Sequence, residues 1–225
     1  MQNDFAVSQI KTEREVENVR LQFLQRLIFP HSDLEGTFAK YSSFETRFDN
    51  TNYVARLKSA NLIASKCRSQ CEIRDSFEYK ISQNHPNVEL FYEYIEYEKS
   101  RGDVGRVPIL FERALVLHCL NPQLWRDYIN YYVISKLSSM EILSVGERAT
   151  RNCMYDVATW CLYLELFAQN DMDADNVTAK KFSVVFERAL GFVSATQNVL
   201  SISQILSCRA SIFSRSISES GIDYC

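Results

Sequence analysis

The chain has 225 residues, a hydrophobic fraction of 46% and an aromatic fraction of 12%. This length and composition suit one folded domain or one segment of a repeat array, and they exclude a disordered chain. With 25 basic and 28 acidic residues the formal net charge is -3, so the sequence lacks the concentrated basic surface of a duplex-binding domain.

The cysteines and the N-terminal residues indicate the cellular compartment of the protein. There are seven cysteines, an odd number, and most of them lie inside helical patterns. Residues 1–5 have neither a basic start nor a continuous apolar run, and no window approaches the ~20 apolar residues of a membrane span. We therefore expect a reducing compartment, the cytosol or the nucleus, and no contact with a membrane.

The first third of the chain predicts three helices. Residues 1–9 are expected to be flexible, and a helix follows at about 10–29, where Pro30 ends it. A second helix is expected to begin at Asp33 with an aromatic stripe on its inner face. A third helical stretch, with weaker apolar periodicity, covers about 52–82.

The central stretch, residues 86–132, contains one helical hairpin and the start of the next. Its apolar residues recur at spacings of one, three and four, which places them on one face of each helix. A turn at Gly102 separates the two helices, and Asn121-Pro122 ends the second one. Because one hairpin cannot bury its apolar face alone, similar hairpins are expected to stack on both sides.

Three local features predict where later helices begin. Pro108 would lose a backbone hydrogen bond inside a helix, so that helix is expected to begin late, near Val107. Ser138 and Glu141 have the spacing of a capping box. Asp156 is expected to cap the helix that follows it.

A three-residue motif marks the repeat. It occurs as Glu112-Arg113-Ala114, Glu147-Arg148-Ala149 and Glu187-Arg188-Ala189. A tryptophan stands twelve residues after each of the first two arginines, and a tyrosine follows it three residues later. This fixed spacing predicts a turn of constant length between repeats, and the pattern decays after the third copy.

The pattern resembles the HAT (half-a-TPR) repeat. In that repeat an aromatic residue, a tyrosine and a glutamate on one helix are followed by Phe-Glu-Arg-Ala-Leu on the second helix and by a proline in the next turn. The resemblance implies an all-α fold, a right-handed superhelical α-solenoid of antiparallel helix pairs. It assigns a structural role to the matching positions, and it identifies no partner-binding residue. The matching positions are Phe38, Tyr41, Glu45, Phe91, Tyr94, Glu98, Glu112, Arg113, Ala114, Pro122, Trp125, Tyr128, Glu147, Arg148, Ala149, Trp160, Tyr163, Glu187, Arg188 and Ala189.

The repeats also predict how the chain is divided. A flexible N-terminus at residues 1–9 precedes a HAT-repeat solenoid at 10–192. A degenerate last helix and a serine-rich tail occupy 193–225. Within the solenoid the repeat cores are expected at about 10–30, 33–83, 86–120, 122–153 and 156–192.

The resemblance implies a protein–protein interaction scaffold in RNA processing, similar to the HAT region of a spliceosomal U4/U6 snRNP assembly and recycling factor. Such a scaffold is nuclear, is not an enzyme and needs no cofactor. The implied partners are spliceosomal or other RNA-processing proteins and a ubiquitin-specific protease, with RNA contacted weakly or indirectly. The family's dimerising repeats lie later than the copies found here, so no homodimer is expected.

Two alternatives stay open on the sequence alone. One is a HAT scaffold of another pre-mRNA splicing, 3′-end cleavage or ribosomal RNA processing complex. The other is a helical repeat that binds RNA directly through its aromatic positions. The helical spacing of those aromatic residues favours the core between helices over a base-stacking surface.

Candidate chemical sites do not match their patterns. The acidic run from Asp171 resembles a calcium loop, but Asn176 and Phe182 stand where glycine and glutamate are needed. Cys67 and Cys71 lack a second ligand pair at zinc spacing. No local motif surrounds a Cys–His pair, and no glycine-rich phosphate loop occurs. We expect neither a metal site nor a catalytic site.

Overall fold

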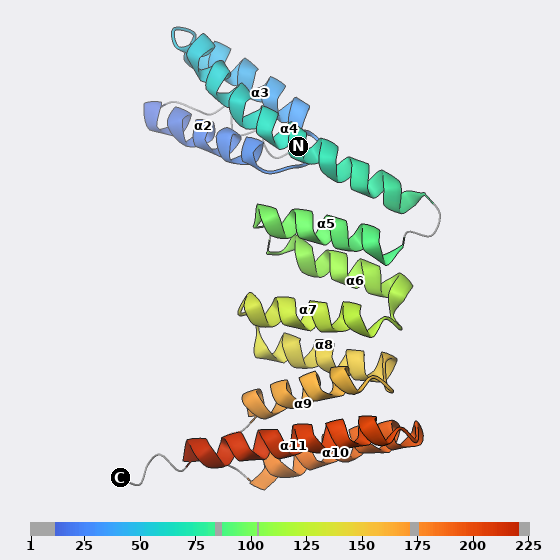
Figure 1. Ribbon diagram of the computed structural model, residues 1–225. Helices are drawn as coiled ribbons and strands as arrows, with labels where there is room; N and C mark the ends of the chain where they lie inside the picture. Colours follow the sequence, from blue (N-terminus) through green and yellow to red (C-terminus); the bar gives the residue numbers. More distant parts are fainter. Residues whose placement is uncertain (1–11, 84–86, 103, 172–175, 221–225) are drawn as a thin grey trace. The chain divides into compact units, whose positions relative to one another are not determined.

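Helices make up the regular structure of the computed structural model (Figure 1), which describes residues 12–83, 87–102, 104–171 and 176–220. No strand occurs among these residues, so the all-α prediction is confirmed. The chain forms two compact units, residues 1–86 and 87–225. The right-handed sense of the superhelix stays a prediction.

The described part of the first unit consists of three helices that contact one another, α2 (Glu13–Ile28), α3 (Leu34–Phe48) and α4 (Tyr53–Ser82). Thr12 and Glu15 form a capping box that begins α2. On α4 the buried residues Ala60 and Ala64 are small, which lets the neighbouring helices approach its backbone. The core of this unit is aromatic and aliphatic, made of Phe23, Leu27, Leu34, Tyr41, Phe44, Ala60, Ala64 and Cys67.

The described helices of the second unit are α5 (Val88–Arg101), α6 (Arg106–His118), α7 (Pro122–Ile134), α8 (Ser139–Asn152), α9 (Val157–Asp171), α10 (Asn176–Ala195) and α11 (Val199–Ser220). The helices from α5 to α9 stack in chain order, and the last two helices lie side by side beyond α9 (Figure 1). Each helix contacts the next, and α7 also contacts α9, as α9 contacts α11. The first helices of neighbouring pairs therefore lie side by side.

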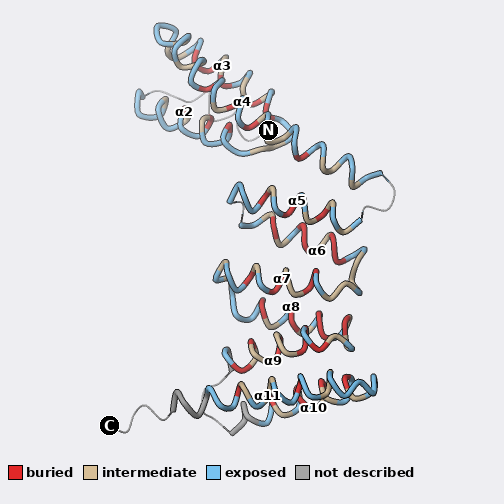
Figure 2. Tube along the Cα trace, in the orientation of Figure 1, coloured by how far each residue is buried: buried red, intermediate tan, exposed pale blue. Residues whose placement is uncertain are grey.

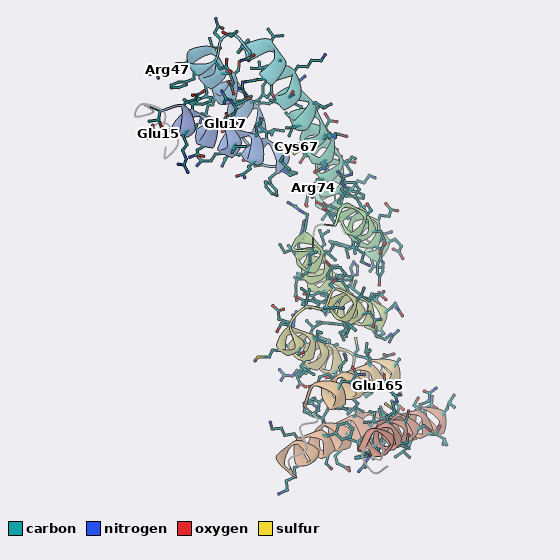
Figure 3. All side chains as sticks on the ribbon, turned by 90° about the vertical axis from the view of Figure 1, so that its left-hand side faces the viewer. Glu15, Glu17, Arg47, Cys67, Arg74 and Glu165 are labelled. Carbon is teal, nitrogen blue, oxygen red and sulfur yellow. The ribbon has the colours of Figure 1, made fainter. Side chains whose placement is uncertain are left out.

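Buried positions recur along successive helices of this unit, as the red segments of Figure 2 show. Contacts between layers also include surface ion pairs. Glu165 of α9, labelled in Figure 3, accepts a hydrogen bond from Arg215 of α11 at 3.3 Å. The stack is therefore stabilised by an apolar core and by ion pairs between helices of neighbouring helical pairs.

Two predicted helix starts are confirmed. Helix α6 begins at Arg106, which puts Pro108 in its first turn, where a backbone N–H has no partner within the helix. Asp156 caps α9, because its Oδ2 atom accepts the backbone N–H of Thr159 at 2.8 Å. The proline therefore costs no intrahelical hydrogen bond.

The predicted capping box before α8 is wrong. Ser138 is the residue at the start of α8, but its side chain makes no capping hydrogen bond. Glu141 is exposed, and an exposed carboxylate gains little by exchanging water for a backbone N–H. The spacing of the two residues was right for a box, but this helix begins without one.

The turns around α5 and α7 follow their residue types. Gly102 ends α5 with a φ of 73°, in the left-handed region that glycine adopts without strain. Before α7, the side chain of Asn121 accepts the backbone N–H groups of Gln123 at 3.0 Å and Leu124 at 3.2 Å. Pro122 is the first residue of that helix, where its fixed φ fits.

In the part of the chain that the structure describes, every helix is too short or too polar to cross a lipid bilayer. The predicted flexible segment at residues 1–9 lies outside the described residues, as do the side chains of the acidic run 171–176. The predicted division into five repeat cores and a tail stays a prediction.

Candidate functional site

Four motif residues of the second unit meet at what we name the first joint. Glu112 of α6 accepts two hydrogen bonds from Arg148 of α8, at 2.6 Å from Nη1 and 2.7 Å from Nη2. The hydroxyl of Tyr128 on α7 donates to the same carboxylate at 3.0 Å. The guanidinium lies over the ring of Trp125, 5.2 Å from its centroid. One glutamate thus ties three successive helices together.

What we name the second joint repeats this arrangement among α8, α9 and α10. Glu147 of α8 accepts two hydrogen bonds from Arg188 of α10, at 2.9 and 2.6 Å. Tyr163 of α9 donates to the same carboxylate at 3.0 Å. The Arg188 guanidinium lies 5.3 Å from the ring centroid of Trp160. In both joints the glutamate of one motif copy binds the arginine of the next copy.

The two tryptophans belong to the core. Each is 1% exposed, and each indole N–H donates to a backbone carbonyl. Trp125 binds the carbonyl of Cys119 at 2.7 Å, and Trp160 binds that of Met154 at 2.8 Å. These rings are closed to a nucleic-acid base, which disfavours the base-stacking alternative.

The glutamates of the two joints are ionised at neutral pH. The hydrogen bonds from Arg148 hold the pKa of Glu112 below its usual value, and those from Arg188 do the same to the pKa of Glu147. Burial raises the pKa of the Tyr128 phenol, so this residue stays a neutral donor. Each joint is therefore a hydrogen-bonded structural network.

Small residues let the helices approach at these joints. The motif alanines Ala114, Ala149 and Ala189 are each 0% exposed. Gly146 precedes the glutamate of the second joint, and a Cβ atom there would lie 2.5 Å from the ring of Tyr163. This position therefore requires glycine for the close packing of α8 on α9.

The glutamates predicted on the first helix of a repeat are more deeply placed. Glu45 and Glu98 are both 0% exposed. Glu45 accepts hydrogen bonds from Nε of Arg20 at 2.5 Å and from its Nη2 at 2.9 Å, and Arg20 itself is 5% exposed. Glu98 lies 4.0 Å from the Nε of Arg106. The Arg20–Glu45 pair is therefore an interior ion pair between adjacent helices, whereas the side chain of Arg106 is 39% exposed.

The predicted aromatic positions of the earlier repeats differ in burial. Tyr41, Phe91 and Tyr94 are each 1% exposed. Phe38 is only half-buried, and the guanidinium of Arg68 covers its ring at 5.5 Å from the centroid. This ring packs against the core of the first unit, and a long charged side chain of α4 lies over it.

The glutamate of the third motif copy does not form a joint like those of the first two copies. Glu187 is exposed, and within the described residues its carboxylate forms no ion pair or side-chain hydrogen bond. Arg113, in the first copy, is half-buried. Glu187 therefore offers a matched control, since it has the motif position without the contacts.

Two buried cysteines lack the low pKa of a reactive thiol. Burial raises the pKa of Cys67 and of Cys153 to about 11, so both thiols are protonated at neutral pH. Among the residues that the structure describes, no three His, Cys, Asp or Glu side chains gather where they could hold a metal ion.

Sequence reasoning missed a groove between α5 and α7. It has a volume of about 550 Å³, and its lining includes Tyr92, Glu96, Lys99, Asp127, Tyr131 and Ile134. The Tyr92 hydroxyl donates to Asp127 at 2.8 Å across it. None of these residues belongs to the repeat motif, so no sequence signal singled them out. They become neighbours only because α5 and α7 lie side by side.

Comparisons with known proteins agree with this architecture. The family described as PRP39 C-terminal HAT repeat matches residues 71–172. The human protein named Spliceosome associated factor 3, U4/U6 recycling protein is 33% identical over 193 residues, which cover 82% of this chain. Its namesake from Danio rerio is 33% identical over 188 residues.

A more distant relative is Pre-mRNA-splicing factor CLF1 of Paracoccidioides brasiliensis, 29% identical over 99 residues, or 43% of this chain. The chain spans 18% of the length of the human relative and 13% of the fungal one. The repeated joints, the stacked helices and these matches lead to one conclusion: the chain belongs to the HAT-repeat family of helical solenoid proteins.

Proposed function

We propose that this chain is a non-enzymatic, protein-docking scaffold of a nuclear RNA-processing complex, of the kind that assembles or recycles the U4/U6 snRNP. The carrying observation is that the charged motif residues are used inside the two joints. Because Glu112 and Glu147 each tie three helices, they stiffen the stack instead of acting on a substrate. A stiff stack presents a wide surface of fixed shape to a partner.

The partners follow from the relatives and from the charge. The names of the matched proteins place them in splicing, which supports spliceosomal proteins as partners. A ubiquitin-specific protease is proposed as a further partner, because the resemblance to the HAT repeat implies one. The formal charge of -3 and the buried tryptophans support a weak or indirect contact with RNA. Homodimerisation is not part of the proposed role, and light scattering of the purified chain should give the mass of a monomer.

Affinity capture from nuclear extract tests this function. The purified chain serves as bait, with and without ribonuclease. Capture of U4/U6-associated proteins or of a ubiquitin-specific protease that survives ribonuclease is the expected result. Capture that disappears with ribonuclease would contradict the proposal and favour a repeat that binds RNA directly.

A matched pair of variants tests the role of the joints. Glu147→Gln weakens the second joint, whereas Glu187→Gln makes the same chemical change at a carboxylate that forms no ion pair or side-chain hydrogen bond within the described residues. The first variant should capture several-fold less partner protein, and the second should equal the parent. Circular dichroism confirms that both are folded. Equal capture by both variants would show that docking does not depend on stiff joints.

A further inference from the structure

The groove between α5 and α7 holds a carboxylate without a cation beside it. Asp127 accepts one hydrogen bond from the Tyr92 hydroxyl and one from the Gln123 side-chain amide, each at 2.8 Å. Both donors are neutral, and none of the described lysines and arginines forms an ion pair with this aspartate. Charged donors bind a carboxylate about twice as strongly as neutral ones.

The contact between α7 and α9 contains a cation bound to its carboxylate, which the groove between α5 and α7 lacks. Between α7 and α9 a carboxylate also bonds across the two helices: Asp156, at the start of α9, accepts a hydrogen bond from Arg126 of α7 at 2.5 Å. The same guanidinium also donates to Gln123 at 2.8 Å. Arg126 stands next to Asp127 in sequence, but its charge is directed to Asp156. The contact between α7 and α9 therefore includes an arginine that binds its carboxylate, whereas the groove between α5 and α7 does not.

Apart from one pair of opposite charges, Lys99 and Glu96, the rest of the groove is neutral or apolar. The Lys99 amine donates to Glu96 at 2.7 Å and lies over the rings of Phe111 and Tyr131, so its charge is already engaged. Ile134 is 80% exposed. It follows Asp127 by seven residues, so the two lie about 10 Å apart along α7. The groove thus offers an anionic position and an apolar position at a fixed separation.

We propose that this groove binds an extended peptide segment of a partner protein, which presents an arginine or lysine to Asp127 and an apolar side chain to Ile134. An extended chain of the polyproline II type rises about 3.1 Å per residue with three residues per turn, so side chains three positions apart share one face and lie about 9 Å apart. A nucleic-acid phosphate would instead meet the carboxylate of Asp127, which repels it. The inference rests on the proposed docking function and names the class of partner.

Peptide selection on the full 225-residue chain tests the anionic position. One library of nine-residue peptides carries a fixed arginine, and its twin carries citrulline, which has the same shape without the charge. We expect the arginine library to bind roughly tenfold more tightly, with leucine, isoleucine or methionine selected about three positions away. Asp127→Asn should abolish the preference for arginine. Glu141→Gln removes an exposed carboxylate on α8 outside the groove and should leave it unchanged.

Ile134→Ser tests the apolar position separately. Because this side chain is exposed, the substitution should not disturb folding, and it should remove the selection of apolar residues while the arginine preference stays. Equal binding of the two libraries, selection of acidic peptides, or an arginine preference that survives Asp127→Asn would overturn the inference. Those results leave the ribonuclease-resistant capture of splicing proteins intact, whereas loss of that capture alone would count against the proposed function.

Discussion

One glutamate–arginine pair of the first unit and the two joint pairs of the second unit lie in opposite surroundings. In the first unit, Glu45 and Arg20 are 0% and 5% exposed, so the pair is part of the core. In the second unit, the side chains of Glu112 and Glu147 are 40% and 23% exposed, and water screens their pairing. The comparison shows that a glutamate–arginine pair can either lie in the core of a unit or link successive helices at its surface.

The chain offers a way to observe the two units separately. Both of its tryptophans, Trp125 and Trp160, lie in the second unit. Tryptophan fluorescence therefore reports unfolding of that unit, whereas far-ultraviolet circular dichroism reports the helices of both.

The largest expected effect is that of Glu45→Gln. The substitution leaves the buried Arg20 without its main partner, and the unfolding free energy should fall by about 3 kcal/mol. Urea denaturation should show an earlier transition by circular dichroism with an unchanged tryptophan midpoint. Glu35→Gln, at an exposed pair with Arg68 in the same unit, is the control and should shift nothing measurable. A shift of both signals together would mean that the two units unfold as one.

Gly146→Ala should come next. Its new Cβ atom would lie 2.5 Å from the Tyr163 ring, and the forced displacement should lower stability by about 2 kcal/mol. The tryptophan midpoint measures the effect. Gly191→Ala is the control, because nothing lies within 4 Å of its Cβ position and helix propensity should stabilise the protein by up to about 1 kcal/mol. Two equal, favourable changes would contradict the close packing of α8 and α9.

Glu147→Gln should have a smaller effect. It removes the charge that binds Arg188, and solvent screening limits the loss to about 1.5 kcal/mol. The same change at Glu187 should stay within about 0.5 kcal/mol, since that carboxylate has no ion pair in the described structure. Guanidinium denaturation followed by fluorescence compares them. If the two variants lost equal stability, the joint would not be the cause.

The smallest effect concerns pH and the first joint. The folded-state pKa of Glu112 lies below its ordinary value of 4.5, because Arg148 binds the ionised form. The stability difference between the parent and Glu112→Gln, about 1 kcal/mol, should be complete above pH 4.5. It should decline as the pH falls from 4.5 through the folded-state pKa, since protonation removes the bond. Urea denaturation between pH 7 and pH 3 measures it, and a difference that stays constant to pH 3 would exclude this joint as its source.

Local sequence features decided much of the helical framework. The late start of α6 follows from Pro108 itself, because a proline lacks the N–H group that only a first turn can spare. The burial of Trp125 and Trp160 follows from their helical spacing. The failed capping box at Ser138 shows the limit of this reasoning, since spacing does not decide where a hydroxyl points.

The sequence by itself determined the helices, the repeat and the family, because these depend on periodicity and on contacts between residues close in the chain. Only the tertiary structure decided that Glu112 binds Arg148, 36 residues away, and that Tyr92 meets Asp127, 35 residues away. Such pairings depend on how successive helices pack, and many acidic and basic residues could satisfy the same pattern. The groove therefore emerges from packing alone.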